Sequence, residues 1–351
     1  MTARGIPDRP AVAVVGATGA VGEELLGLLG SRGFPLRALR AFAGERGAGR
    51  TVRAAGHEAT VERLSPGCFE GIDVAFFCAS AAVSREWAPR AVAAGAWVVD
   101  KSSAFRMDPA CPLVIPEVNG GELDALRGPA IVAVPNCTTI IALMAVSPLH
   151  REAGVARMVV STYQAASGAG AAAMEELAQQ ARDWSAGRAL DTRIFGRQYL
   201  FNLFSHDSRV GDDGQNDEER KLVDETRRIW GDPAVQVSAT CVRVPVLRAH
   251  SESINLTFRR PLTEARAREL LAAAPGVRIV DDRAANRFPE PLAASGHDEV
   301  LVGRIRADAG QAPGMGLSLF VSGDQIRKGA ALNGVQIAER LLQRYATLRG
   351  K

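Results

Sequence analysis

The chain has 351 residues, of which 47% are hydrophobic and 23% charged, and its formal net charge is +3. This composition is typical of a globular protein with about two domains, and it excludes an intrinsically disordered or fibrous chain. The net charge is too close to zero to indicate a nucleic-acid partner or a membrane-surface partner.

The cysteines and the apolar segments indicate where the protein works. Five cysteines, an odd number, are spread along the chain at positions 68, 78, 111, 137 and 241, which predicts thiols in a reducing compartment rather than a disulfide framework. The N-terminal MTARGIPDRP lacks the apolar run of a signal peptide. Pro135 and Asn136 interrupt the apolar stretch 131–146, which is shorter than the roughly 20 residues of a membrane span. We therefore expect a cytoplasmic protein without a membrane partner.

Strands and helices alternate in the first part of the chain. AVAVV (11–15) is predicted to be a buried strand, followed by a glycine turn and a helix that ends near Gly30–Gly33. Further strands are predicted in 36–43, 72–79, 96–105 and 130–136, extended segments in 51–64 and 112–119, and a helix in 84–95. This order predicts an α/β domain with a parallel sheet covered on both faces, as in a Rossmann-like nucleotide-binding domain.

After Cys137 the pattern changes to that of an α+β domain. Helices are predicted in 138–153, 173–184 and 216–230, and strands in 157–167, 235–246, 250–258, 301–308 and 316–323. Several of these strands alternate polar and apolar residues, which predicts a mostly antiparallel sheet. A final helix over 326–348 has no strand after it, so we expect it to return to the first domain. The predicted domains are therefore 1–136 with 326–351, and 137–325.

A glycine-rich turn predicts a nucleotide site. Gly16, Gly19 and Gly22 lie between a strand and a helix, where glycines let backbone N–H groups approach a pyrophosphate, although a purely structural turn has the same pattern. In FAGERGAGR, after the second strand, Glu45 would bind the ribose hydroxyls of NAD and Arg46 would accommodate the 2′-phosphate of NADP. Arg46 favours NADP, with NAD as the alternative.

Cys137 is the central candidate for chemistry, in AVPNCTTIIALM at the junction of a strand and a helix. Cysteine is more often a small buried residue than a nucleophile, and this segment alone leaves both interpretations open. His250 and Arg243 lie in or beside predicted strands, where polar side chains need partners. His250 is therefore either a structural histidine or a base for Cys137. In DKSSAFRM, Ser103 and Arg106 form either an anion site or a capped turn.

Together these segments resemble the aspartate-β-semialdehyde dehydrogenase family, in the form found in plants and many bacteria. The resemblance extends from about Ala11 to Leu342 and rests on VVGATGAVG, SSAFRM, PLVIPEVN, PNCTTI, VSTYQAASGAG, FNLFSH, VRVPVLRAHSES, VGRIR and GDQIRKGAALN, in that order. It implies a Rossmann-like NADP-binding domain and a catalytic and dimerisation domain. It also implies a cytoplasmic homodimer or homotetramer of lysine, threonine and methionine biosynthesis, with no metal and no nucleic-acid partner.

The resemblance implies a reaction and a role for each matching residue. The reaction is the reversible, NADPH-dependent reduction of L-4-aspartyl phosphate to L-aspartate 4-semialdehyde and phosphate through a thioester on Cys137. The implied residues fall into four groups: His250, Asn136 and Gln164 assist Cys137 in catalysis; Arg243, Glu218 and Gln164 bind the amino-acid substrate; Arg106, Lys221 and Ser103 bind phosphate; and Gly16, Thr18, Gly19, Ala20, Val21, Gly22, Arg46, Gly47, Ser167, Gly168 and Gln325 bind the cofactor.

The chain departs from the family pattern on the cofactor side. Gly44 and Gly47 stand where the family has serines, Cys78–Ala82 where it has SAGGS, and Lys101 where it has Asn. Lys101 would supply a compensating positive charge near the nucleotide. Two other functions fit part of the pattern: a reductase of N-acetylglutamyl phosphate or of a CoA thioester, and a non-catalytic nucleotide-binding paralogue. The first leaves the contacts to a free amino acid without a purpose, and the second does not explain why both cysteine and histidine are present.

Overall fold

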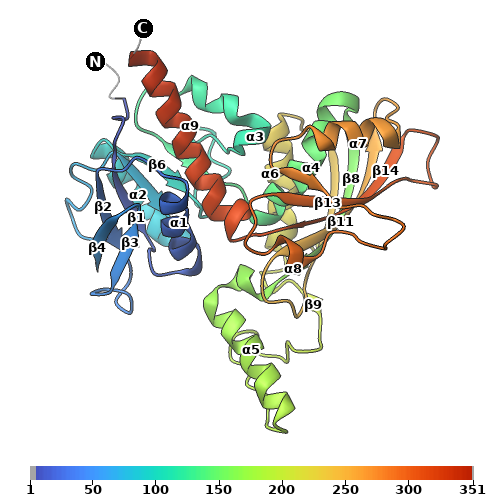
Figure 1. The fold of residues 1–351 in the computed structure, drawn as a ribbon, viewed down its shortest axis with the longest axis horizontal. Helices are drawn as coiled ribbons and strands as arrows, with labels where there is room; N and C mark the ends of the chain where they lie inside the picture. Colours follow the sequence, from blue (N-terminus) through green and yellow to red (C-terminus); the bar gives the residue numbers. More distant parts are fainter. Residues whose placement is uncertain (1–4, 350–351) are drawn as a thin grey trace. The chain divides into compact units, whose positions relative to one another are not determined.

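The structure is a computed structural model that describes residues 5–349, and its contacts divide the chain into two units (Figure 1). Unit 1 contains the chain up to Asn136 and again from Ala330, and unit 2 is Cys137–Gly329. The chain therefore leaves unit 1 at the peptide bond that precedes Cys137, and it returns to unit 1 immediately before the last helix.

Unit 1 is built on a 7-stranded sheet in the order β3-β4-β2-β1-β5-β6-β7. Its strands are β1 (Ala11–Val15), β2 (Ala38–Phe42), β3 (Thr51–Ala54), β4 (His57–Glu62), β5 (Val74–Phe77), β6 (Trp97–Asp100) and β7 (Ile131–Ala133). Neighbouring strands pair in parallel, except for the antiparallel β3–β4 hairpin. Every residue of β1 is buried, because a parallel strand covered on both faces needs apolar side chains on both.

Helices cover both faces of this sheet. Ala88 and Ala91 of α2 (Ala81–Ala93) pack on one face in a cluster with Ala13 and Phe77. On the other face α9 (Leu332–Arg349) contacts β6 and also α1 (Ala20–Ser31), and the ring of its Tyr345 lies 5.3 Å from that of Trp97. The predicted Rossmann-like α/β class is therefore confirmed.

Two predicted segments of this part of the chain differ in the structure. The segment 112–119 is extended only at its start, and Pro116–Asn119 forms the short helix α3, because proline at the first helical position has its φ already set for a helix. The long helix predicted from 326 begins instead with a π-helical turn, Arg327–Ala331, and only then continues as α9. A 3-10 helix, Gly120–Ala125, was not predicted.

Unit 2 contains a second 7-stranded sheet, in the order β12-β13-β14-β11-β8-β10-β9. Its strands are β8 (Val155–Gln164), β9 (Phe204–Ser205), β10 (Gln236–Arg243), β11 (His250–Phe258), β12 (Val277–Ile279), β13 (Val300–Ala307) and β14 (Gly316–Gly323). β12–β13 and β8–β10 are parallel pairs, and the other neighbours are antiparallel. The sheet is thus mixed and mostly antiparallel, as predicted.

The helices of unit 2 are α4 (Cys137–Ala153), α5 (Ala171–Ser185), α6 (Asp217–Trp230), α7 (Glu264–Ala272) and α8 (Pro291–Ala294), and a 3-10 turn covers Ala166–Ala169. α4 contacts β8, β11, β13 and β14, and α6 contacts β10. α4, α5 and α6 lie where the sequence predicts helices. α7 was not predicted, although Thr263, whose Oγ1 accepts a hydrogen bond from Arg266 N at 3.2 Å, is a typical N-cap residue.

A buried glutamate lies within this sheet. Glu252, in β11, pairs with Thr162 of β8 and Val321 of β14. Its exposure is 0%, and neither carboxyl oxygen has a hydrogen-bond partner among residues 5–349. Burial raises the pKa of Glu252 well above its ordinary value, because a low-dielectric interior disfavours the charged form. The side chain is therefore held as the neutral acid.

We predict that Glu252→Gln raises the free energy of unfolding at neutral and alkaline pH. The folded protein keeps a proton on Glu252 that the unfolded chain loses above the ordinary glutamate pKa, so wild-type stability falls as pH rises towards the folded-state pKa. The advantage of the variant should grow by up to about 1.4 kcal/mol per pH unit in that window. Urea denaturation at several pH values measures it.

The matched control for this prediction is Glu122→Gln, which makes the same substitution at an exposed glutamate. Its stability is measured relative to wild type over the same pH series, and the difference should be small. A stability difference for Glu252→Gln that stays constant with pH would contradict the neutral form of Glu252.

Candidate active site

Cys137 is the first residue of α4, directly after the turn that follows β7. The N-terminal end of a helix carries a partial positive charge that stabilises an anion such as a thiolate. Cys137 is partly exposed, and Gly329 of the π-helical turn lies beside it: a Cβ atom at Gly329 would be 2.9 Å from the Cβ of Cys137. Only glycine leaves room for this approach, so the turn Arg327–Ala331 lies against the cysteine.

His250, the first residue of β11, is fully buried and held by the backbone. Its Nδ1 accepts a hydrogen bond from the N–H of Ala165 at 3.0 Å, so the proton of the neutral ring is on Nε2. Nε2 is buried and has no hydrogen-bond partner within residues 5–349. Burial, and next the charge of Arg243, lower the pKa of His250 to about 3. The ring is therefore neutral, with one N–H available to a ligand.

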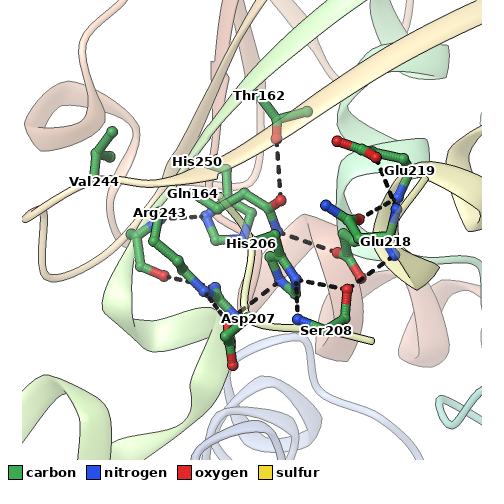
Figure 2. A network of polar contacts seen from close by, with 12 residues as sticks. Thr162, Gln164, His206, Asp207, Ser208, Glu218, Glu219, Arg243, Val244 and His250 are labelled. Atoms are coloured by element: carbon green, nitrogen blue, oxygen red, sulfur yellow. Dashed lines mark hydrogen bonds and ion pairs between the residues drawn. The ribbon is translucent and has the colours of Figure 1, made fainter. Parts of the chain in front are cut away.

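Arg243 lies at the end of β10 and is only 3% exposed. Its Nε donates to Oδ1 of Asp207 at 2.8 Å, and its Nη1 donates to the carbonyl of Ala165 at 3.3 Å. Burial raises the pKa of Asp207, but the charge and hydrogen bond of Arg243 outweigh that effect and lower it. Asp207 is therefore ionised, and it orients the guanidinium (Figure 2).

Gly168 lets Arg243 and His250 approach the same point. A Cβ atom at Gly168 would lie 2.8 Å from Nη1 of Arg243 and 3.1 Å from Nε2 of His250. Any side chain here would displace one of them. The backbone of the 3-10 turn Ala166–Ala169 therefore lies against both the guanidinium and the imidazole.

A chain of polar contacts links three predicted substrate and phosphate residues (Figure 2). Gln164 accepts from Thr162 Oγ1 at 3.0 Å and donates from Nε2 to Oε1 of Glu218 at 3.1 Å. Oε2 of Glu218 forms an ion pair with Nζ of Lys221 at 3.1 Å. Gln164 and Glu218 are 1% and 5% exposed, so an amide and a carboxylate are buried together where the end of β8 meets the start of α6.

Local folding places Glu218 and Lys221 in the first turn of α6. Asn216 and Glu219 form a capping box, in which the Asn216 side chain accepts from Glu219 N and the Glu219 side chain accepts from Asn216 N. This motif fixes where the helix begins. Because residues three apart lie on the same face of a helix, Glu218 and Lys221 point the same way.

Several residues of this site were not predicted from the sequence. Asp207 was not singled out, nor was His206, whose pKa burial lowers and whose Nδ1 accepts from Ser208 N at 3.2 Å. Tyr199 was also missed; its hydroxyl donates to the carbonyl of Val244 at 2.5 Å. The motif FNLFSH precedes Asp207, but an acidic residue in a loop carries no signal of its own partner.

Gln325, predicted to contact the cofactor, is 3% exposed and bound at both ends of its amide. Its Oε1 accepts from the N–H of Ala249 at 2.9 Å, and its Nε2 contacts Oγ of Ser167. Ser167 N in turn donates to the carbonyl of Leu247 at 3.0 Å. The structure therefore brings the loop of Ser167 and the segment that precedes His250 together around Gln325.

In unit 1 the predicted nucleotide residues form a tight turn. A Cβ atom at Gly16 would lie 2.4 Å from the carbonyl oxygen of Cys78, and one at Gly22 would lie 2.1 Å from that of Gly16. Gly19 is the N-cap of α1, and no side chain of the described residues caps this helix, whose first residues are Ala20 and Val21. The uncapped helix start and the glycine turn fit the phosphates of a dinucleotide.

The loop after β2 approaches this turn. A Cβ atom at Gly47 would lie 2.5 Å from Oγ1 of Thr18, so the loop packs closely on the glycine turn. Arg46 is exposed, and the neighbouring Glu45 lies 3.9 Å from Arg63. This loop therefore presents a cation beside the predicted cofactor residues.

The predicted anion loop of unit 1 is organised by Asp100. Its buried carboxylate accepts from Oγ of Ser84 at 2.8 Å and from both the N–H and Oγ of Ser102. Arg106, also buried, donates from Nη2 to the carbonyl of Lys101 at 2.8 Å, whereas Ser103 is exposed. The carboxylate thus shapes a loop that contains hydroxyls and a guanidinium, which suits an anionic group.

Within residues 5–349 there is no group of three or more His, Cys, Asp or Glu side chains that could hold a metal ion. No helix in this part of the chain is long and apolar enough to cross a membrane.

Two family models match the chain, one in each unit. Residues 11–126 match the model described as "Semialdehyde dehydrogenase, NAD binding domain". Residues 146–328 match "Semialdehyde dehydrogenase, dimerisation domain". The first match contains the glycine turn and the second contains His250 and Arg243.

Curated relatives and a solved structure agree with these matches. The aspartate-semialdehyde dehydrogenase of Synechocystis sp. is 48% identical over 97% of this chain and 99% of its own length, and that of Aquifex aeolicus is 46% identical over 95% and 98%. The crystal structure of aspartate semialdehyde dehydrogenase II of Vibrio cholerae complexed with ASA superposes with a TM-score of 0.92 at 39% identity, covering 96% and 99% of the two chains. From this identity and coverage we conclude that the chain belongs to the aspartate-semialdehyde dehydrogenase family.

Proposed function

We propose that this chain catalyses the reversible, NADPH-dependent reduction of L-4-aspartyl phosphate to L-aspartate 4-semialdehyde and phosphate. The observation that carries the proposal is the presence of two opposite charges near His250: the buried guanidinium of Arg243 and the buried carboxylate of Glu218. Arg243 suits an α-carboxylate and Glu218 suits an α-ammonium group. An N-acetylated substrate or a CoA thioester has no free ammonium group to bind, so the pairing favours a free amino acid.

In the proposed first half-reaction the Cys137 thiolate attacks the carbonyl carbon of the acyl phosphate. A sulfur–carbon bond forms, the bond from that carbon to the phosphate oxygen breaks, and phosphate leaves. Asn136 and the N-terminus of α4 stabilise the oxyanion that forms during the attack. Gln164 lies near the reacting carbon, and Arg106, Ser103 and Lys221 bind the departing phosphate.

In the proposed second half-reaction the thioester becomes an aldehyde. When bound, the reduced cofactor supplies the hydride for the thioester carbon. His250 donates its Nε2 proton to the oxygen on this carbon, because Nδ1 carries no proton and accepts a hydrogen bond from the N–H of Ala165. As the carbon–sulfur bond of the resulting hemithioacetal breaks, its hydroxyl returns the proton to His250, and the aldehyde and the Cys137 thiolate are released. In the reverse direction His250 exchanges a proton with the same oxygen, again as an acid/base.

We propose NADP rather than NAD as the cofactor. Arg46 is exposed in the loop that packs against Thr18, where a 2′-phosphate would be accommodated in this fold. The nearby acid Glu45 has a cationic neighbour of its own, Arg63. Gly44 and Gly47 add no hydroxyl donors here, so the preference for NADP depends on the charge of Arg46. Lys101 adds a further positive charge on unit 1.

We further propose a cytoplasmic homodimer or homotetramer that serves lysine, threonine and methionine biosynthesis. The match of residues 146–328 to a dimerisation domain supports self-association. On the sheet of unit 2 the rings of Tyr163 and Phe320 lie 6.1 Å apart, and Tyr163 is 38% exposed. The cytoplasmic location is supported by the cysteines, none of which forms a disulfide within residues 5–349.

We predict that Cys137→Ser lowers kcat by about 10³-fold or more, because a serine hydroxyl is a far weaker nucleophile than a thiolate and does not form the thioester. The measurement is NADPH formation from L-aspartate 4-semialdehyde, NADP and phosphate. Cys68→Ala is the control, since Cys68 is 4% exposed in the core of unit 1 and should retain activity. Equal rates for wild type and Cys137→Ser would exclude the thioester mechanism.

We predict that Arg46→Ala raises KM for NADP about tenfold while leaving KM for NAD nearly unchanged. The reason is that one charge-assisted contact to a phosphate contributes on the order of 1.5 kcal/mol. Steady-state kinetics with both nucleotides measure it. Arg53→Ala is the matched control, because Arg53 is also exposed but pairs with Glu58 in the β3–β4 hairpin. An equal rise for both nucleotides in Arg46→Ala would contradict a role in recognising the 2′-phosphate.

A further inference from the structure

The two residues after β14 bind the backbone and side chain of the segment that leads to His250. Oδ2 of Asp324 accepts from Nε of Arg248 at 2.6 Å, and Oε1 of Gln325 accepts from the N–H of Ala249 at 2.9 Å. The first pair of residues across β11 and β14 is His250 with Gly323. Two successive side chains at the end of one strand therefore hold the start of its neighbour.

Ala249 has a backbone conformation that L-residues rarely adopt. Its φ is +71°, in the left-handed region that favours glycine. A non-glycine residue stays in this region only when its surroundings hold it there. The bond from Ala249 N–H to Gln325 is such a constraint, and it acts on the residue immediately before His250.

The other end of the Gln325 amide reaches the loop that contacts the His250 ring. Nε2 of Gln325 contacts Oγ of Ser167. The same loop supplies the Ala165 N–H that binds Nδ1 of His250. Gln325 thus links the segment that carries the histidine to the loop that orients its ring.

Gln325 also lies close to the turn that contacts the cysteine. A Cβ atom at Gly329 would lie 3.3 Å from Cβ of Gln325 and 2.9 Å from Cβ of Cys137. Gly329 therefore lies between Gln325 and Cys137, and Ala249 lies between Gln325 and His250.

We propose that Gln325 is a positioning residue that sets His250 relative to Cys137 by fixing the left-handed turn at Ala249. This proposal rests on the proposed function only in taking Cys137 and His250 to act together. It differs from a cofactor contact, because a positioning residue acts on the enzyme before the cofactor binds.

The test is the variant Gln325→Met, which keeps the length of the side chain but removes the acceptor for Ala249 N–H. The matched control is Gln311→Met, because Gln311 also binds the β11 backbone, through the carbonyl of Leu256 at 3.3 Å, but at the far end of the strand. Two quantities are measured: kcat and KM for NADP, and the rate at which iodoacetamide alkylates Cys137 in cofactor-free enzyme over a range of pH. Peptide mass spectrometry assigns the modified cysteine.

We expect Gln325→Met to lower kcat about tenfold with little change in KM for NADP, since small displacements of catalytic groups have effects of this order. Its alkylation profile should move towards that of His250→Ala, whereas Gln311→Met should match wild type. A raised KM for NADP with a wild-type alkylation profile would overturn the proposal in favour of a cofactor contact. Equal profiles for wild type and His250→Ala would instead overturn the Cys137–His250 pair itself.

Discussion

The backbone of one residue, Ala165, organises the chemistry of this site. Its N–H binds Nδ1 of His250 and its C=O accepts from Nη1 of Arg243. The imidazole assigned to the reacting oxygen and the guanidinium assigned to the substrate carboxylate are thus both placed by backbone groups of the same residue. The same N–H decides the tautomer of the histidine, so it fixes which ring nitrogen can give a proton as well as where the ring lies.

The sequence predicted the fold well because the signals that define it are local. A buried strand followed by a glycine turn and a helix is visible in a single stretch of residues, and its repetition predicts the parallel sheet of unit 1. Two differences, α3 and α7, have local signals in Pro116 and Thr263, whereas a third falls where a long-range contact overrides local pattern. Arg327–Ala331 reads as the start of a helix, yet it forms a π-helical turn, where Gly329 approaches the side chain of Cys137.

The candidate site was predictable only in part, for the same reason. The order of the motifs predicts four residues of the site, Cys137, His250, Arg243 and Glu218. The roles assigned to them stay predictions. The sequence does not show that Asp207 binds Arg243, because the two come from a loop and a strand and meet only in the folded chain. Nor can residue types reveal a bond made by backbone, such as that of Ala165, since every residue other than proline has the same N–H group.

The ion pairs described above also bear on the net charge of a molecule that would bind Arg243 and Glu218. Arg243 is paired with Asp207 and Glu218 with Lys221, so each of these charges already has a partner within unit 2. The head group of the proposed amino-acid substrate is zwitterionic, so its own charges cancel and it would add no net charge beside these pairs. A ligand that carries only one of the two charges would bring a net charge of its own into a low-dielectric environment, at a cost in desolvation.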